Sequence, residues 1–321
     1  MNATHTTTPD PRDTPILLIV FRRTDLTKRV FEAIRRHRPR RLFIAADGPR
    51  PERGRDEARQ CEATRAITEL VDWPCHVSRH YATENLGVSR RPNSAIDWAF
   101  EHVDRLVVLE DDCLPSPDFF RFCTEMLERF ADDPRIYSVC GVNLQSAEWT
   151  CPASYCFSRY SHSWGWATWK RAWAAQDLQL SRWKQLRSSD WIERYFERRD
   201  EARCWRDILD RTIEGRVAAW DYQWNFNNWV HGRFAVHSGR NLVCNIGFGA
   251  DASNTTIASG IGGIPIQALE FPLRHPDAVE RDVRADRLAF ERIYRPWTLA
   301  QKLRHRMARI RKLITGRDRA A

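Results

Sequence analysis

The 321-residue chain has no apolar run that approaches the roughly 20 residues needed to cross a bilayer. Its first residues, MNATHTTTPDPRDT, lack the basic stretch followed by an apolar stretch that marks a secretory signal. We therefore expect residues 1–14 to be a disordered leader and the protein to be cytoplasmic.

None of the nine cysteines lies in a CxxC pair, so neither a paired zinc knuckle nor a disulfide framework is indicated. Cys151 and Cys156 are the closest two in the sequence. We interpret the cysteines as reduced thiols. A structural zinc or a disulfide at Cys151 and Cys156 is the alternative.

The body of the chain lacks a strong charge of either sign. The formal net charge is +9, but residues 295–321 hold nine Lys or Arg and one Asp, so the other 294 residues carry +1. The basic character is thus a property of the C-terminal tail, and the body is no basic platform for nucleic acid. A composition with 42% hydrophobic and 29% charged residues is typical of a soluble globular protein of one large or two modest domains.

Buried strands and helices alternate along the first half. Apolar runs predict strands at 15–21, 41–50, 75–81 and 105–112, and amphipathic stretches predict helices at 25–37, 55–72 and 92–103. This alternation predicts a parallel α/β sheet, in which ligands bind at the carboxyl ends of the strands. Arg22, Arg23, Asp47 and the triplet 110–112 fall at such ends, so we expect them to converge on one crevice.

Three adjacent carboxylates, Glu110, Asp111 and Asp112, follow the buried residues Val107–Leu109. Like charges repel, and desolvating each of them is costly, so a positive group is expected beside them. Hard divalent cations take oxygen ligands. The segment therefore indicates either a Mn²⁺ or Mg²⁺ site or a solvated acidic turn.

The second half is rich in tryptophan, with eleven of the fourteen in residues 149–229. Trp166, Trp169, Trp173 and Trp224 are candidates for a sugar-stacking wall, although most aromatic side chains belong to cores. A helix is expected after Gly165, and strands at 233–238 and near 241–249. His162 and Asp251 are further pocket candidates.

Taken together, VVLEDDCLPSPDFFRFC, the flanking RHY, NLG and YSVCGVN, and the first two strands, PILLIVF and LFIAADGPR, resemble GT-A-fold glycosyltransferases. The similarity is greatest to the N-acetylglucosaminyltransferase I type and to bacterial sugar transferases with an EDD variant of the DxD motif. It covers residues 15–145 well. It continues more weakly through WGWATWKRAW, WDYQW and NLVCNIGFG to about residue 256.

The resemblance implies a GT-A fold, Rossmann-like with a mostly parallel sheet and flanking helices. Residues 15–145 would be the half that binds the nucleotide sugar, and 146–256 the acceptor-side half of the same domain. Residues 257–294 would be a C-terminal extension and 295–321 a basic amphipathic tail.

The resemblance also implies roles for individual residues. Asp112 would coordinate the metal that bridges a nucleoside diphosphate, and Glu110 and Asp111 would bind the donor's sugar and ribose. Arg23 and Asp47 would hold the nucleotide, unless Arg23 is a surface charge and Asp47 a turn former.

Other candidates for the ligand site are Arg22, Asn85, Gly87, Arg90, Arg91 and Trp166. Asn85 and Gly87 allow a tight loop near the ligand. Arg90 and Arg91 precede an expected helix start, where amide groups attract anions, although both could equally be solvated.

Asp221 in AAWDYQWN matches the family's Asp after a Trp on the acceptor side, so it is the candidate general base of an inverting transfer. Its alternative role is a helix N-cap. One departure concerns the metal: NIGFG is followed by Asp251-Ala252-Ser253-Asn254 and lacks the His of the relatives. Whether Asp251 or Asn254 completes the metal site therefore stays open.

The function expected is transfer of a sugar from a nucleoside diphosphate, with UDP favoured, to a glycan or glycolipid hydroxyl. A sugar-nucleotide nucleotidyltransferase is the first alternative, but FRRTDLTKR lacks the glycines usual after its first strand. A non-enzymatic protein that binds nucleic acid or an anionic surface is the second.

The tail has Leu299, Leu303, Met307, Ile310 and Ile314 on one helical face and basic residues on the others. This pattern fits peripheral binding to an anionic membrane, a helix packed on its own domain, or contact with nucleic acid.

Overall fold

The computed structural model describes residues 9–145, 149–248 and 264–295. Its centre is an eight-stranded sheet in the order β3-β2-β1-β4-β8-β6-β9-β7. The strands in that order are His76–Tyr81, Arg41–Ala46, Ile16–Val20, Arg105–Glu110, Trp166–Trp169, Ile136–Cys140, Phe234–Ser238 and Tyr155–Ser158. Strands β8 and β7 run against the other six, so the sheet is mostly parallel. The α/β class predicted from the alternating pattern is confirmed.

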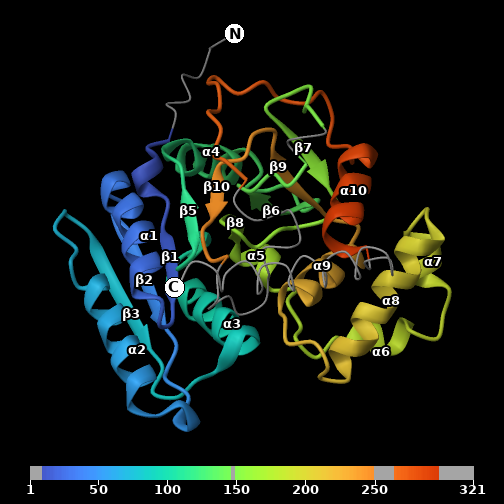
Figure 1. Ribbon diagram of the computed structural model, residues 1–321. Helices are drawn as coiled ribbons and strands as arrows, with labels where there is room; N and C mark the ends of the chain where they lie inside the picture. The colour runs from blue at the N-terminus through green and yellow to red at the C-terminus, as the bar shows by residue number, and fades with distance from the viewer. Residues whose placement is uncertain (1–8, 146–148, 249–263, 296–321) are drawn as a thin grey trace, which may run out of the picture.

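The first four strands are joined by helices that cover both faces of the sheet (Figure 1). These helices are α1 (Thr24–His37), α2 (Gly54–Thr68) and α3 (Gly87–Phe100). The chain moves outward from β1 to β3 and then returns to β4 beside β1. Because such crossovers are right-handed, the return places α3 on the opposite face from α1 and α2.

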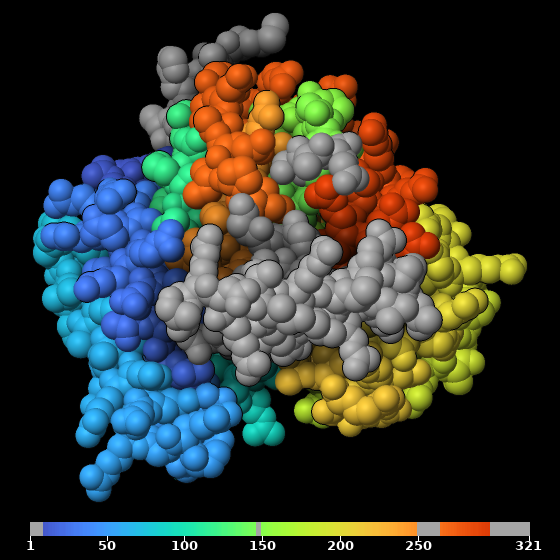
Figure 2. All heavy atoms as spheres, viewed as in Figure 1, coloured from blue at the N-terminus to red at the C-terminus, as the bar shows by residue number. Residues whose placement is uncertain are grey.

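After β4 the chain makes short β5 (Cys113–Pro115), which pairs antiparallel with β10 (Val243–Asn245), and then α4 (Pro117–Arg129). The helices of the second half lie mostly on the right of Figure 1, away from α1 and α2, with α5 near the centre; Figure 2 shows the same face with all atoms. They are α5 (Lys170–Trp173), α6 (Ser181–Leu186), α7 (Trp191–Tyr195), α8 (Arg199–Ile213), α9 (Asp221–Trp229) and α10 (Val283–Ala289). Single turns occur at η1 (Pro11–Asp13), η2 (Pro51–Arg53) and η4 (Phe290–Tyr294).

One hydrophobic core joins the two halves of the chain. It runs from Ile16 on β1 through Phe119 on α4 to Trp224 on α9 and Leu273 beyond β10. A second, smaller core under α8 and α9 includes Trp183, Trp205 and Trp229. Among the described residues, no helix has the length and apolar character needed to cross a bilayer.

Two predicted elements differ in the structure. α3 begins at Gly87, five residues before the expected start at Pro92, because Asp47 accepts hydrogen bonds from the first amides of this helix. Trp166–Trp169 forms β8, a central strand, and only the four-residue α5 of the expected helix follows it. A run of four residues is too short for its period to distinguish strand from helix.

Candidate functional site

Three neighbouring strands end at one edge of the sheet. β1 lies between β2 and β4 and runs parallel to both. Arg23 follows β1, Asp47 follows β2, and the triplet Glu110–Asp112 completes β4 and continues beyond it. The sheet order thus brings these residues to the same edge, as the sequence predicts.

Arg23 is the positive partner of the acid cluster, by which we mean Glu110, Asp111 and Asp112. Its guanidinium donates to Asp111 and lies 3.0 Å from Oδ2 of Asp112. The exposed fractions of these side chains are 20% for Arg23, 4% for Asp111 and 12% for Asp112. The backbone N–H of Phe21 also donates to Asp111 at 3.4 Å. A protein cation therefore supplies part of the counter-charge that three adjacent acids require.

The acid cluster still holds more negative than positive charge. Burial, together with the charges of Asp112 and Asp111, raises the pKa of Glu110 to about 8. Burial also raises the pKa of Asp111 to about 6, although the charge of Arg23 opposes the rise. For Arg23, burial lowers the pKa, but the two aspartates outweigh this effect and raise it. Three carboxylates facing one guanidinium therefore favour either a retained proton or an added cation.

The β5–β10 pair closes one side of the acid cluster. The backbone N–H of Ile246 donates to the carbonyl of Asp112 at 2.8 Å. A Cβ on Gly247 would lie 2.3 Å from Oδ2 of Asp112 and 2.9 Å from Nη1 of Arg23. Only glycine fits such an approach, so Gly247 belongs to the site. The glycines of NIGFG are its signal in the sequence, and the part that Gly247 plays follows only from this close approach in the structure.

Asp221, in the second half of the chain, lies near enough to Glu110 for their charges to interact. It is the first residue of α9, and the N-cap position belongs to Trp220. Burial raises the pKa of Asp221, while the amides of Asp221 and Tyr222 lower it in part. The charge of Asp221 in turn contributes to the raised pKa of Glu110. The fold therefore brings together two carboxyl groups that are 111 residues apart in the sequence.

Asp47 organises its own loop. Its carboxylate accepts hydrogen bonds from the backbone of Gly48, Leu86 and Gly87 and from the side chain of Asn85, all between 2.8 and 3.0 Å. These bonds join the end of β2 to the start of α3. Because a carboxylate has about four acceptor positions, a nucleotide would have to replace one of these bonds. The observed contacts of Asp47 are therefore those of a turn former, which is its alternative role.

The glycines of this loop permit a close backbone approach. A Cβ on Gly48 would lie 2.5 Å from the backbone carbon of Glu84, and Gly87 has a φ of +78°. The Asn85 amide donates to Asp47 and to the carbonyl of Gly48 at 2.9 Å. Asn85 and Gly87 therefore form the tight loop expected of them, and they do so through Asp47.

The three other arginine candidates point in different directions. Arg22 turns to α2, where its Nε lies 3.6 Å from Glu57. Arg90 lies exposed in the first turns of α3, while Arg91 is 2% exposed and donates to the carbonyl of His80. Of these, only Arg90 offers an exposed guanidinium.

The tryptophan candidates pack in the core. Trp166, Trp169, Trp173 and Trp224 are between 0 and 5% exposed. The rings of Trp166, Trp173 and Trp224 lie 5.0–6.2 Å apart, centroid to centroid. Trp166 is completely buried. The structure therefore places it in the aromatic core and gives it no surface on which a sugar or nucleotide could stack.

His162 is also buried, with its ring 4.9 Å from that of His237. Burial lowers its pKa well below the usual value, and the nearby His237 adds to the effect. Its Nε2 has no hydrogen-bond partner within the described part of the chain. His162 is thus a neutral interior residue instead of part of an open pocket.

Two groups of predicted residues lie outside the described ranges: Asp251 with Asn254, and the tail from residue 296 onward. The nine cysteines are free thiols. Cys151 and Cys156 are buried in one small apolar cluster with Trp149 and Ala285.

The acid cluster is suited to a cation that brings most of its own ligands. Among residues 9–145, 149–248 and 264–295, no three His, Cys, Asp or Glu side chains form a metal cage. Asp112 nevertheless keeps 12% of its side chain exposed beside surplus negative charge. Mg²⁺ typically binds through one or two carboxylates and completes its shell with water and phosphate oxygens. The residues present fit that mode and do not fit an all-protein site.

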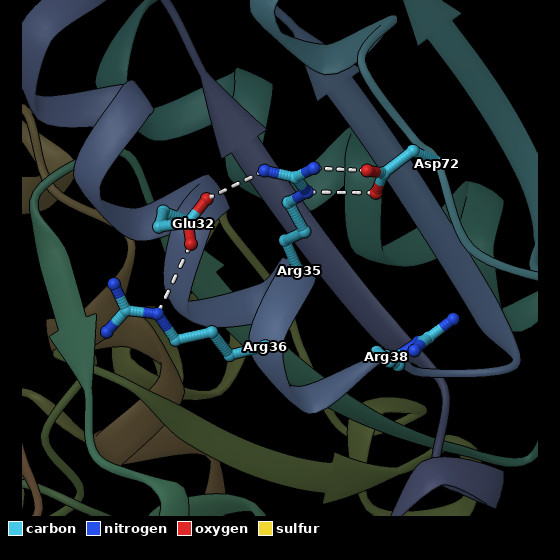
Figure 3. Close-up of a pocket in the computed structure, with 5 residues that line it drawn as sticks. All are labelled: Glu32, Arg35, Arg36, Arg38 and Asp72. Carbon is cyan, nitrogen blue, oxygen red and sulfur yellow. Dashed lines mark hydrogen bonds and ion pairs between the residues drawn. The ribbon is translucent and has the colours of Figure 1, made fainter.

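A hollow of about 320 Å³ lies at the other edge of the sheet, where α1 ends (Figure 3). Its walls are Glu32, Arg35, Arg36, Arg38 and Asp72. Arg35 pairs with Asp72, and Arg36 lies 3.2 Å from Glu32, so most of these charges neutralise one another. The hollow is remote from the acid cluster and shares no residue with it.

No protein-family model matches this chain, and no curated protein is significantly similar to it in sequence.

Proposed function

We propose that the protein is a metal-dependent, inverting glycosyltransferase with a GT-A-type fold. The observation that carries the proposal is the acid cluster. It combines surplus negative charge, a position at the carboxyl edge of a parallel sheet, and Asp221 on the facing helix. A parallel sheet binds ligands at this edge, and phosphate-linked cations bind to such carboxylates.

Asp112 is the residue proposed to hold the cation, because its carboxylate is the more exposed of the two aspartates. When bound, Mn²⁺ or Mg²⁺ offsets the charge that develops on a leaving diphosphate. The charges of both Asp112 and Asp221 act on Glu110, and its carboxyl group is proposed to bond to a sugar hydroxyl. Asp111 stays fixed by Arg23 and by the amide of Phe21.

Asp221 is the proposed general base. The acceptor hydroxyl oxygen forms a bond to the anomeric carbon while the bond from that carbon to the diphosphate oxygen breaks. The hydroxyl proton passes to the carboxylate of Asp221, and the diphosphate leaves with the electron pair. Attack on the face opposite the leaving group inverts the anomeric centre, and positioning of both reactants lowers the barrier.

The donor is proposed to be a nucleoside-diphosphate sugar, with UDP favoured, and the acceptor a surface glycan or glycolipid. Both follow from the sequence resemblance. The basic tail, 295–321, would suit a lipid-linked acceptor if it binds an anionic membrane. Co-sedimentation of the full chain with anionic vesicles, compared with a chain truncated after Tyr294, tests this part at low and high salt.

The direct test of the function is a panel of sugar nucleotides incubated with the protein and Mn²⁺. Release of nucleoside diphosphate, and its loss on chelation, is the expected result. Release of pyrophosphate from a nucleoside triphosphate and a sugar phosphate would instead identify a nucleotidyltransferase. No turnover with any donor or acceptor would favour a non-enzymatic binding protein.

A further inference from the structure

Adjacent arginines at the end of β1 have separate tasks. Arg22 reaches Glu57 at 3.6 Å and Gln60 at 3.3 Å, both on α2. Arg23 enters the acid cluster, where it bonds to Asp111 and lies 3.0 Å from Asp112. The two arginines, adjacent in the sequence, therefore pair with acids on different elements, Glu57 on α2 and the acid cluster beyond β4.

The two bonds of Arg23 differ in how firmly they are held. Asp111 is 4% exposed, and the amide of Phe21 also fixes its carboxylate. Asp112 is 12% exposed, and within the described part of the chain its carboxylate accepts one other hydrogen bond, a weak donation from the thiol of Cys113 at 3.5 Å. Asp112 is therefore the partner that Arg23 can release at the lower cost.

The backbone at Gly247 bounds the Arg23 side chain on one side. Gly247 lies against both its Nη1 and the carboxylate of Asp112, and any side chain there would collide with them. The guanidinium is bonded to Asp111, and 20% of the Arg23 side chain remains exposed. A planar guanidinium donates in a fork, so it can keep one carboxylate and turn its remaining N–H groups toward an anion.

We propose that Arg23 is the resident counter-ion of the acid cluster and that a divalent cation displaces it from Asp112 but not from Asp111. This inference rests on the proposed function for the identity of the ligands. The freed N–H groups of Arg23 then face the negative diphosphate that accompanies the cation.

The exchange has a measurable consequence for the order of binding. The positive charge of Arg23 disfavours a cation that arrives alone, whereas a diphosphate compensates both positive charges. Mn²⁺ alone should therefore bind weakly, and Mn²⁺ with a nucleoside diphosphate should bind far better than the two separate affinities suggest.

The test is titration of the full-length protein with Mn²⁺ alone, with free Mn²⁺ followed by electron paramagnetic resonance. Arg23→Gln removes the competing charge, and we expect it to bind Mn²⁺ at least about tenfold more tightly. This factor follows because an arginine within about 4–6 Å of an aspartate lowers the proton affinity of that carboxylate by about one to three powers of ten, and a metal cation competes with the arginine in the same way. Arg22→Gln is the matched control and should leave Mn²⁺ affinity unchanged.

A second measurement covers the case in which Arg23→Gln does not fold. Arg23→Lys keeps the charge but loses the fork, so it should bind Mn²⁺ alone as weakly as the wild type and lose the gain that nucleoside diphosphate provides. If folded Arg23→Gln binds Mn²⁺ no more tightly than the wild type, or Arg23→Lys keeps the full gain, the proposal is overturned. Both measurements follow the binding of Mn²⁺ and neither requires turnover. Their outcome can therefore be distinguished from a failure of the glycosyltransferase assay.

Discussion

The acid cluster and the tryptophan group are two concentrations of one residue type, and the fold uses them in opposite ways. The acids lie at the carboxyl edge of the sheet, where part of Asp112 reaches solvent and Arg23 balances only part of their charge. Trp166 on β8, Trp173 on α5 and Trp224 on α9 pack against one another, with at most 5% exposed. Both groups stand out equally in the sequence.

The difference shows that position in the sheet decides function more than residue type does. An aromatic ring in the interior gains free energy from burial and from edge-on contacts with its neighbours. A carboxylate gains nothing from burial unless a cation accompanies it, so its placement needs a further explanation. The acid cluster is therefore the site candidate, and the tryptophans belong to the hydrophobic core.

The largest effect is expected on donor turnover, from a substitution in the acid cluster. Asp112→Asn should reduce metal-dependent donor turnover by about a thousandfold or more, because several kcal/mol of transition-state stabilisation depend on the cation. Thermal unfolding should change little. The exposed Asp25→Asn on α1 is the control. Equal affinity of the wild type for nucleoside diphosphate with and without Mn²⁺ would contradict this prediction.

Asp221→Asn should have the next largest effect. It keeps the shape of the side chain but removes the proton acceptor, so kcat should fall by roughly 10²–10⁴, the usual contribution of a general base. The Kd for the donor, measured by calorimetry, should barely change. A variant with nearly normal kcat would make Asp221 a structural residue at the start of α9.

Trp166→Ala should act on stability instead of on ligand binding. Loss of a fully buried tryptophan costs about 3–5 kcal/mol of the free energy of unfolding, which denaturant titration measures. The exposed Leu70→Ala serves as the control and should change the free energy little. If Trp166→Phe is stable but raises the KM for donor or acceptor several-fold, then Trp166 lines the ligand site after all.

The smallest effect is expected at His37, which belongs to neither group, and it concerns the pH dependence of stability. Its ring stacks on Phe120 at 4.0 Å, and burial lowers its pKa to about 4, opposed by the carbonyl of Pro11. Between about pH 4 and 6.5 the unfolded chain binds a proton that the folded chain does not, so stability rises with pH in this window.

His37→Phe keeps the stacking and removes this proton. The slope of unfolding free energy against pH should then fall by up to about 1.4 kcal/mol per pH unit between pH 4 and 6.5, and activity should be unchanged. Unfolding titrations at several pH values measure the slope. An unchanged slope would mean that His37 titrates normally in the folded protein.

Several features follow from the sequence alone. The apolar runs ILLIV and LFIAA specify buried strands because every one of their residues is buried, and α1 follows from one amphipathic face. Alternation of such elements gives a parallel sheet, and a parallel sheet gathers the ends of its strands at one edge. That edge, with Arg23, Asp47 and the acid cluster, was therefore predictable.

Only the tertiary structure decided how these residues pair. Asp47 is bound to a loop some 40 residues away, which moves the start of α3 to Gly87. Arg23 bonds to acids 88 residues away, while Arg22 does not. β8 becomes a central strand because β4 and β6 supply its hydrogen bonds, although its four residues carry no clear period. The local sequence pattern determines which side chains of an element are buried. The pairing of residues that are far apart in the sequence depends on the order of strands in the assembled sheet, and a short stretch of sequence does not specify that order.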